Sequence, residues 1–164
     1  MAHNQTLAFS ISSRAVQNNE FISAQQAGIG CGASAENISP DLEWTGVPIG
    51  AKSLALVVHD PDAPRANGFY HWIVVDIPPT VMGVAEGANF APPARELNTD
   101  FNRPGYNGPC PPPGSGPHRY HFTLYALGAQ TLEFSSTNSP HEIASAIEAQ
   151  SIAQTAIIGL YGRD

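Results

Sequence analysis

Basic side chains are scarce in this sequence, which has seven Lys plus Arg against fourteen Asp plus Glu and a formal net charge of −7. A chain with this balance has little electrostatic attraction to the phosphate backbone of a nucleic acid or to an anionic membrane surface. We therefore expect no nucleic acid partner. Apolar runs long enough to cross a bilayer are also missing from the sequence. Stable membrane insertion is accordingly not expected.

Cysteine is equally rare, with only Cys31 and Cys110 in the chain. The two form no Cys-x-x-Cys pattern, and the start of the sequence has neither the basic nor the apolar region of a signal peptide. We therefore expect a soluble protein in the cytoplasm. In that reducing compartment the two cysteines are expected to be free thiols rather than a disulfide.

Compact catalytic and metal-binding motifs are missing as well. The sequence contains no Gly-x-Ser-x-Gly nucleophile elbow, no Gly-x-Gly-x-x-Gly phosphate loop and no His-Glu-x-x-His zinc motif. We therefore expect no cofactor and no metal, although a metal site drawn from Asp60, His71 and His118 is an alternative that the residue types allow.

Turn-forming residues, in contrast, are abundant. Fifteen glycines and fifteen prolines accompany a composition that is 42% hydrophobic and 13% charged. Short strands separated by structured loops fit this composition better than a helical bundle does. No internal repeat or linker divides the chain. The sequence thus predicts a mainly β, single domain over residues 1–164 with one or two short helices.

The apolar runs predict the strands of this domain. The main strands are expected at residues 53–60, 71–77, 118–126 and 155–161, with shorter or edge strands at 7–12 and 41–44. Because residues 61–70 are rich in turn formers, the strands on either side of them should form an antiparallel pair. Residues 102–117 contain too many prolines for a central strand and should form a rigid loop.

One helix is predicted near the C-terminus. Ser139 suits the N-cap, Pro140 the first turn and Glu142 the reciprocal position of a capping box. The helix should end near Ile152. In the loop after residue 60, Ala63–Pro64 is a candidate cis peptide bond.

Three polar residues occupy the ends of predicted strands. Strict alternation of side chains places Asp60, His71 and His118 each on an apolar face of its strand. The apolar residues on those faces are Leu54, Leu56 and Val58 for Asp60, Ile73, Val75 and Ile77 for His71, and Tyr120, Phe122 and Leu124 for His118.

These three residues could form an anion site. The hairpin brings Asp60 and His71 to the same end of the sheet, whereas the sequence alone does not place His118 beside them. A carboxylate beside imidazole rings holds them by hydrogen bonds and favours their protonated form, so an anion could bind without Lys or Arg. The alternative is a purely structural role at the strand ends. For the remaining histidines of the strands and helix, we expect surface or supporting positions; these are His59, His121 and His141.

Several segments resemble a known family. They are Asp-Pro-Asp-Ala-Pro at 60–64, Phe-Tyr-His-Trp at 69–72, Gly-Pro-Cys-Pro-Pro-Pro-Gly at 108–114, and His-Arg-Tyr at 118–120. With Asn-Ile-Ser-Pro at 37–40 and Leu-Glu-Trp at 42–44, the chain resembles the phosphatidylethanolamine-binding protein family, also called Raf kinase inhibitor protein-like, in its compact bacterial and archaeal branch. The resemblance implies a β-sandwich of two antiparallel sheets.

The resemblance also implies a pocket for phosphate, acetate or a phosphoethanolamine-like head group. Asp60, His71 and His118 match the anion-site residues of the family. The matching wall positions are Tyr120, Pro111, Cys110, Pro64, Phe69 and Tyr70. Many eukaryotic members have Trp where Phe69 stands, and we expect their long C-terminal helix to be absent after Tyr161.

Two classes of function follow from this pocket. The leading expectation is a regulatory protein that binds a small anion, is not an enzyme, and has a kinase or protease as its protein partner. The alternative is an enzyme in which His71 or His118 acts as general acid or base on a small anionic or carbonyl substrate, with Asp60 orienting the ring. Because the branch that the chain resembles often forms homodimers, we also expect a homodimer.

Overall fold

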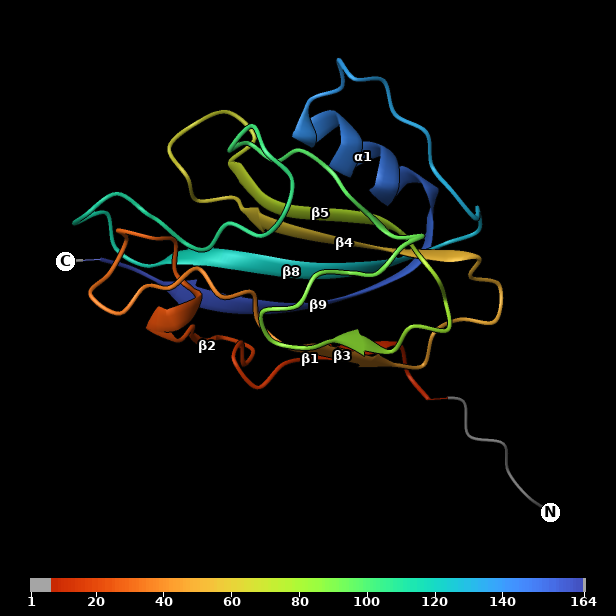
Figure 1. Ribbon diagram of the computed structural model, residues 1–164, viewed down its shortest axis with the longest axis horizontal. Coiled ribbons are helices and arrows are strands. Elements are labelled where there is room, and N and C mark those ends of the chain that lie inside the picture. The colour runs from red at the N-terminus through yellow and green to blue at the C-terminus, as the bar shows by residue number, and fades with distance from the viewer. Residues whose placement is uncertain (1–6, 164) are drawn as a thin grey trace.

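A computed structural model describes residues 7–163 as two β-sheets and a covering helix (Figure 1). The large sheet has the strand order β2-β9-β8-β4-β5-β7, and the small sheet has the order β1-β3-β6. The strands are β1 (Ser10–Ser12), β2 (Glu20–Phe21), β3 (Leu42–Thr45), β4 (Ser53–Asp60), β5 (Phe69–Ile77), β6 (Gly83–Val84), β7 (Arg95–Glu96), β8 (His118–Leu127) and β9 (Ser151–Tyr161), and the helices are the 3-10 turn η1 (Ala24–Gln26) and α1 (Pro140–Gln150). These elements confirm the predicted mainly β class with two sheets.

The strands pair almost entirely in the antiparallel sense. Strand β4 lies between β5 and β8, and β8 continues the sheet to β9. Among the strands of residues 7–163, only the short pairing of β2 with β9 is parallel. The predicted bounds of β4 are confirmed. Strand β9 begins at Ser151, four residues before the predicted start, because the chain passes directly from α1 into the strand.

Helix α1 has the predicted N-terminus. The Ser139 hydroxyl accepts a hydrogen bond from the Glu142 amide at 3.1 Å, and the Glu142 carboxylate accepts one from the Ser139 amide at 2.9 Å. This capping box satisfies two amide groups that would otherwise lack partners at the helix start. The helix ends at Gln150, two residues before the predicted end.

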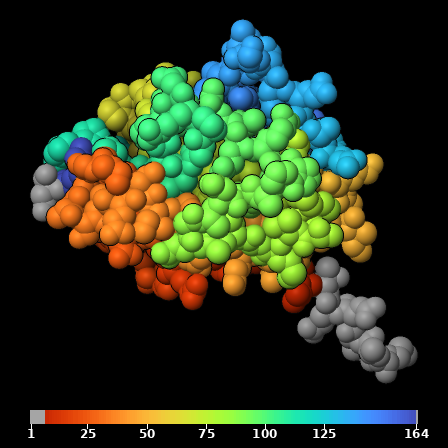
Figure 2. Space-filling view, in the orientation of Figure 1, coloured from red at the N-terminus to blue at the C-terminus, as the bar shows by residue number. Residues whose placement is uncertain are grey.

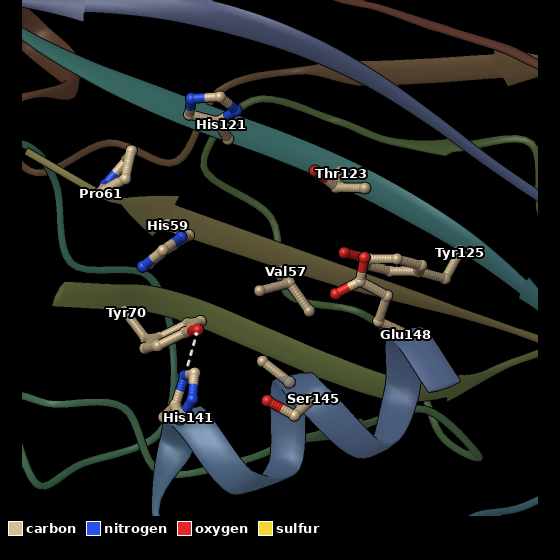
Figure 3. A pocket seen from close by; sticks show the side chains of 11 residues that line it. Val57, His59, Pro61, Tyr70, His121, Thr123, Tyr125, His141, Ser145 and Glu148 are labelled. Carbon is tan, nitrogen blue, oxygen red and sulfur yellow. Dashed lines mark hydrogen bonds between the residues drawn. The ribbon is translucent and has the colours of Figure 1, made fainter. Parts of the chain in front are cut away.

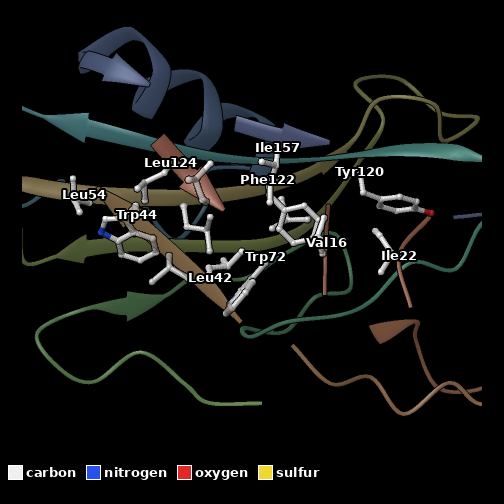
Figure 4. Close-up of a cluster of buried hydrophobic side chains, with 14 of the residues drawn as sticks. Val16, Ile22, Leu42, Trp44, Leu54, Trp72, Tyr120, Phe122, Leu124 and Ile157 are labelled. Atoms are coloured by element: carbon white, nitrogen blue, oxygen red, sulfur yellow. The ribbon is translucent and has the colours of Figure 1, made fainter. Parts of the chain in front are cut away.

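The core consists of two layers, one on each face of the large sheet. The layer between the two sheets contains the buried Trp44 and Trp72 (Figure 4), whose indole N–H groups donate to Val81 and Glu96 at 2.7 Å. The other layer lies under α1 and includes Ile147. Each large apolar side chain that is fully buried stabilises the fold by roughly 1.5–3 kcal/mol.

Strand β5 does not alternate strictly. Its pairing with β4 skips His71, because Trp72 and Tyr70 face consecutive residues of β4. His71 is therefore the extra residue of a β-bulge. A second register shift lies near Asp76, whose φ of 59° is in the left-handed region.

Because of these bulges, the side-chain alternation predicted for β5 is partly wrong. Ile73 and Val75 pack in the layer under α1, whereas His71 lies on the other side of the sheet with Asp60. Ile77 packs between the two sheets because the second bulge reverses the alternation again. The parity predicted for β4 and β8 holds, since their inward residues belong to the layer between the sheets.

The expectation of free thiols is also wrong, because Cys31 and Cys110 form a disulfide with their Cα atoms 5.1 Å apart. The proline-rich loop folds back onto the segment after η1, where the Gly28 amide donates to the Pro109 carbonyl at 3.0 Å. In Figure 2 the orange segment around residues 25–40 lies on the same face of the molecule as the green-to-teal loops. This approach brings the two cysteines within disulfide geometry.

The cis peptide bond of residues 7–163 is Pro92–Pro93, so the prediction of a cis bond at Ala63–Pro64 is wrong. Within the same residues, no helix combines the length and the apolar character that crossing a membrane requires.

Candidate functional site

A cavity of about 300 Å³ opens where β4 ends and where β5 and β8 begin. The loop after β4 and the proline-rich loop before β8 form its walls. Its lining residues are Asp60, Ala63, Pro64, Arg65, Phe69, His71, Phe101, Cys110, Pro111, Pro112, His118 and Tyr120. The structure thus brings His118 to Asp60 and His71, which the sequence pattern alone did not do.

Asp60 and His118 form a buried pair at the base of this pocket. The Asp60 carboxylate accepts a hydrogen bond from His118 Nδ1 at 2.7 Å, and its other oxygen accepts from the Asp62 amide at 2.8 Å. On the far side of the ring, Ser115 Oγ lies 3.2 Å from His118 Nε2 and donates to the Pro112 carbonyl. The carboxylate therefore fixes the ring and can balance a positive charge on it.

His71 is held differently. Its Nδ1–H donates to the Asn107 carbonyl at 2.8 Å, and the Asn107 amide donates back to the His71 carbonyl at 3.1 Å. Burial lowers the pKa of His71 to about 4, and the hydrogen bond to Asn107 and the charge of Asp60 only partly oppose this effect. The expectation that the carboxylate favours a protonated ring therefore fails at His71, because desolvation dominates.

The Tyr120 side chain is buried, and its hydroxyl makes no hydrogen bond of full geometry within residues 7–163, although the Asp60 carboxylate and the Cys110 backbone lie close to it. Burial, followed by the charge of Asp60, raises the pKa of this phenol, so it keeps its proton at neutral pH. The Tyr120 ring packs edge-on against His71 with centroids 5.3 Å apart. A buried donor without a partner costs free energy until it meets an acceptor, so this hydroxyl is poised for a ligand.

Arg65 and Phe101 belong to the pocket but were missed in the sequence. The Phe101 ring packs against Phe69 and His71 with centroid distances of 4.7 and 5.3 Å, and the Arg65 guanidinium lies 5.0 Å from the Phe69 ring centroid. Arg65 is half exposed and lies 3.9 Å from Asp100. Arg65 directly follows Pro64, a predicted wall residue, and this position could have indicated it. Phe101 stands in a loop that carries no motif.

The pocket walls are anchored to the sheet. Asp62 accepts hydrogen bonds from the backbone and side chain of Arg119 on β8 at 2.8–3.0 Å, which ties down the loop after β4. These hydrogen bonds lower the pKa of Asp62 to about 2. On the opposite wall, Arg163 donates to the Pro111 carbonyl at 2.7 Å. Both walls are therefore largely preformed.

Eight of the nine predicted ligand-binding residues line this pocket. They are Asp60, His71, His118, Tyr120, Pro111, Cys110, Pro64 and Phe69. Tyr70 does not, because neighbouring residues of a strand point to opposite faces and Tyr70 packs on the α1 side. No group of three or more His, Cys, Asp or Glu between residues 7 and 163 is placed to hold a metal ion.

The chain is similar to known proteins in sequence and in structure. The model of the phosphatidylethanolamine-binding protein family matches residues 12–162. The UPF0098 protein YbcL of Escherichia coli (strain K12) is 36% identical over 163 residues, which are 96% of this chain and 89% of the relative. A UPF0098 protein of Methanothermobacter thermautotrophicus is 43% identical over 135 residues, covering 78% of this chain and 85% of the relative.

A solved structure has the same fold over nearly the whole chain. The crystal structure of E. coli YbcL, described as a new member of the mammalian PEBP family, superimposes with a TM-score of 0.88 at 34% sequence identity. The match covers 95% of this chain and 99% of that structure. The two-sheet architecture that carries the pocket is therefore shared.

Proposed function

Because this chain belongs to the phosphatidylethanolamine-binding protein family, we propose that its pocket binds a small anionic group: a phosphate, a phosphorylated head group or a carboxylate. The observation that carries the proposal is the convergence of Asp60, His71, His118 and the Tyr120 hydroxyl, which makes no hydrogen bond of full geometry, in one preformed cavity. A buried phenol donor supports an acceptor ligand, and the nearby guanidinium of Arg65 at the rim supports one with negative charge.

Binding should require a proton. The Nδ1–H of His71 already donates to the Asn107 carbonyl, so Nε2 is the ring nitrogen left for a ligand. In the neutral ring Nε2 carries a lone pair and no proton. An anion repels that lone pair unless the ring takes up a proton or the ligand brings one. The Asp60–His118 pair is close to neutral when both members are charged, so it adds little net attraction.

Titration with sulfate tests this proposal. Sulfate carries no proton at neutral pH, so the His71 ring must take one up for sulfate to bind. Since the pKa of His71 in the free protein is about 4, we expect the affinity for sulfate to rise by close to tenfold per pH unit as the pH falls from about 7 to about 5. The measurement follows the ring signals of His71 and His118 by NMR in the full chain.

The controls separate this site from general charge effects. His59→Gln changes a ring on the other face of the sheet and should leave sulfate affinity unchanged, whereas His71→Gln should remove its pH dependence. Phosphate and acetate serve as comparison ligands for the phosphoryl and carboxylate classes. Silence of both ring signals with all three anions would sink the proposal.

Replacement of Tyr120 by Phe should separate binding from stability. Removing the hydroxyl takes away one ligand donor, so anion affinity should fall by about fivefold to tenfold. The free energy of unfolding without ligand should stay equal or rise by about 1 kcal/mol, because an unsatisfied buried polar group disappears. Urea unfolding and the sulfate titration check the two halves, and a loss of stability with unchanged affinity would contradict the assignment.

The other functional expectations stay predictions. They are a regulatory role, restraint of a kinase or protease partner, and a homodimer. The disulfide weighs against the predicted cytoplasmic location, because disulfides persist mainly in oxidising compartments.

A further inference from the structure

A second cavity, of about 270 Å³, lies on the other face of the large sheet, between the sheet and α1 (Figure 3). It is separated from the anion pocket by the thickness of the sheet. Its lining residues are Val57, His59, Pro61, Tyr70, His121, Thr123, Tyr125, His141, Ala144, Ser145 and Glu148. The cavity thus contains the three histidines that were expected to have only surface or supporting positions.

The charge of this second cavity is negative. Glu148, which is exposed to solvent, is the only Asp, Glu, Lys or Arg among its lining residues, and it forms no ion pair within residues 7–163. It lies in the last turn of α1, which has no basic residue to offset the partial negative charge of the helix end. Figure 3 shows its side chain reaching from the helix toward Tyr125 on β8. This arrangement attracts a cation.

The ring nitrogens of the cavity offer acceptors. His59 Nε2–H donates to the Asn67 carbonyl at 2.8 Å, which leaves Nδ1 of the neutral ring as a lone pair. His121 Nε2 is buried without a partner, and burial together with Arg119 lowers the pKa of this ring, which keeps it uncharged at neutral pH. The uncharged His121 ring therefore adds no positive charge that would oppose a cation in the cavity.

Aromatic faces complete the cavity. The Tyr70 ring stacks on His59 at a centroid distance of 4.2 Å, and its hydroxyl lies 3.0 Å from Nδ1 of His141 at the start of the helix. Burial raises the pKa of Tyr70 to about 12 and also raises that of Tyr125, so both remain neutral phenols with electron-rich faces. Such faces attract ammonium groups.

We propose that this second cavity binds a small organic cation with a primary ammonium group, held between Glu148 and the Tyr125 ring, with its apolar chain along Val57 and Ala144. An anion is disfavoured because Glu148 is the only Asp, Glu, Lys or Arg that lines the cavity, and its carboxylate repels negative charge. A metal ion is disfavoured because no group of three or more ligating side chains is suitably placed in the described part of the chain. The site is independent of the anion pocket.

The experiment uses n-butylammonium chloride as the probe with the full, isotope-labelled chain. We expect saturable NMR shifts at the His59 and His121 rings and at Tyr125, with a dissociation constant in the millimolar range. Glu148→Gln should weaken binding by about fivefold, and Tyr125→Leu by about threefold, whereas Tyr125→Phe keeps the ring face and should stay within about twofold of wild type.

Matched controls make the outcome decisive. Glu133→Gln removes the same charge outside the cavity and should leave binding unchanged, and potassium chloride at equal concentration should give no saturable shift. Equal losses in Glu148→Gln and Glu133→Gln would show general charge attraction and overturn the proposal. Binding of Zn²⁺ at these rings without any binding of butylammonium would overturn it in favour of a metal site. Sulfate binding to the anion pocket should be unaffected by these variants.

Discussion

Reduction of the Cys31–Cys110 disulfide is expected to lower the free energy of unfolding by about 4 kcal/mol. The two cysteines are separated by 79 residues, so the crosslink closes a long loop in the unfolded chain and reduces its conformational entropy. Urea unfolding of oxidised and reduced wild type measures the effect. The double variant Cys31→Ala/Cys110→Ala should reproduce it without reductant.

The same change should affect the anion pocket much less. Although Cys110 lines the pocket, its loop is also held by the hydrogen bonds of Gly28 to Pro109, of Gly108 to Asn37 at 2.7 Å and of Arg163 to Pro111. We expect sulfate affinity in the reduced, folded protein to stay within about threefold of the oxidised value. An unfolding midpoint that does not move on reduction would contradict the stability prediction.

Much of the large sheet could be predicted from local patterns. Strand β4 and helix α1 carry strong signals, an apolar run ended by turn residues for β4 and a capping box with proline for α1. Parity along β4 and β8 was predicted correctly because both strands keep an unbroken register with each other from Ser53–Leu127 to His59–His121. In such a ladder, alternation alone fixes which face each side chain takes.

Parity along β5 could not be read from the sequence. Residues 70–75 are all buried, because one face of the strand meets the layer between the sheets and the other lies under α1. A strand that is buried on both faces shows no polar alternation, so a bulge leaves no trace in its pattern. The bulge at His71 is nevertheless what allows this ring and Trp72 to lie on the same side of the sheet.

The long-range parts of the site were beyond local patterns. Arg65 and Phe101 join the pocket only because the loop before β5 and the loop after β7 fold over the first residues of β5. The disulfide likewise depends on the approach of two loops that are far apart in the sequence. Loop conformations of this kind are set by tertiary contacts. The expectation that Asp60, His71 and His118 lie together came instead from the resemblance of their segments to a known family.

Acid should destabilise this protein through His71. The pKa of this histidine is about 4 in the folded state against about 6.5 in an unfolded chain, so between these values the unfolded state binds more protons. The stabilising effect of the neutral buried ring is complete above about pH 6.5, and it is lost as the pH falls toward about 4. We expect this loss to reach about 3 kcal/mol.

Urea unfolding of wild type and His71→Gln is measured at a series of pH values. The carboxylates contribute equally to both proteins, so the difference between their slopes of unfolding free energy against pH belongs to His71. His141→Gln, which removes an exposed ring, controls for general loss of an imidazole. Sulfate, if it binds the protonated ring, should offset the acid loss by about 2.7 kcal/mol at a concentration of 100 times its dissociation constant. Parallel slopes in wild type and His71→Gln would show that folding does not lower the pKa of His71, and the pH dependence predicted for sulfate binding between about pH 7 and about pH 5 would fall with it.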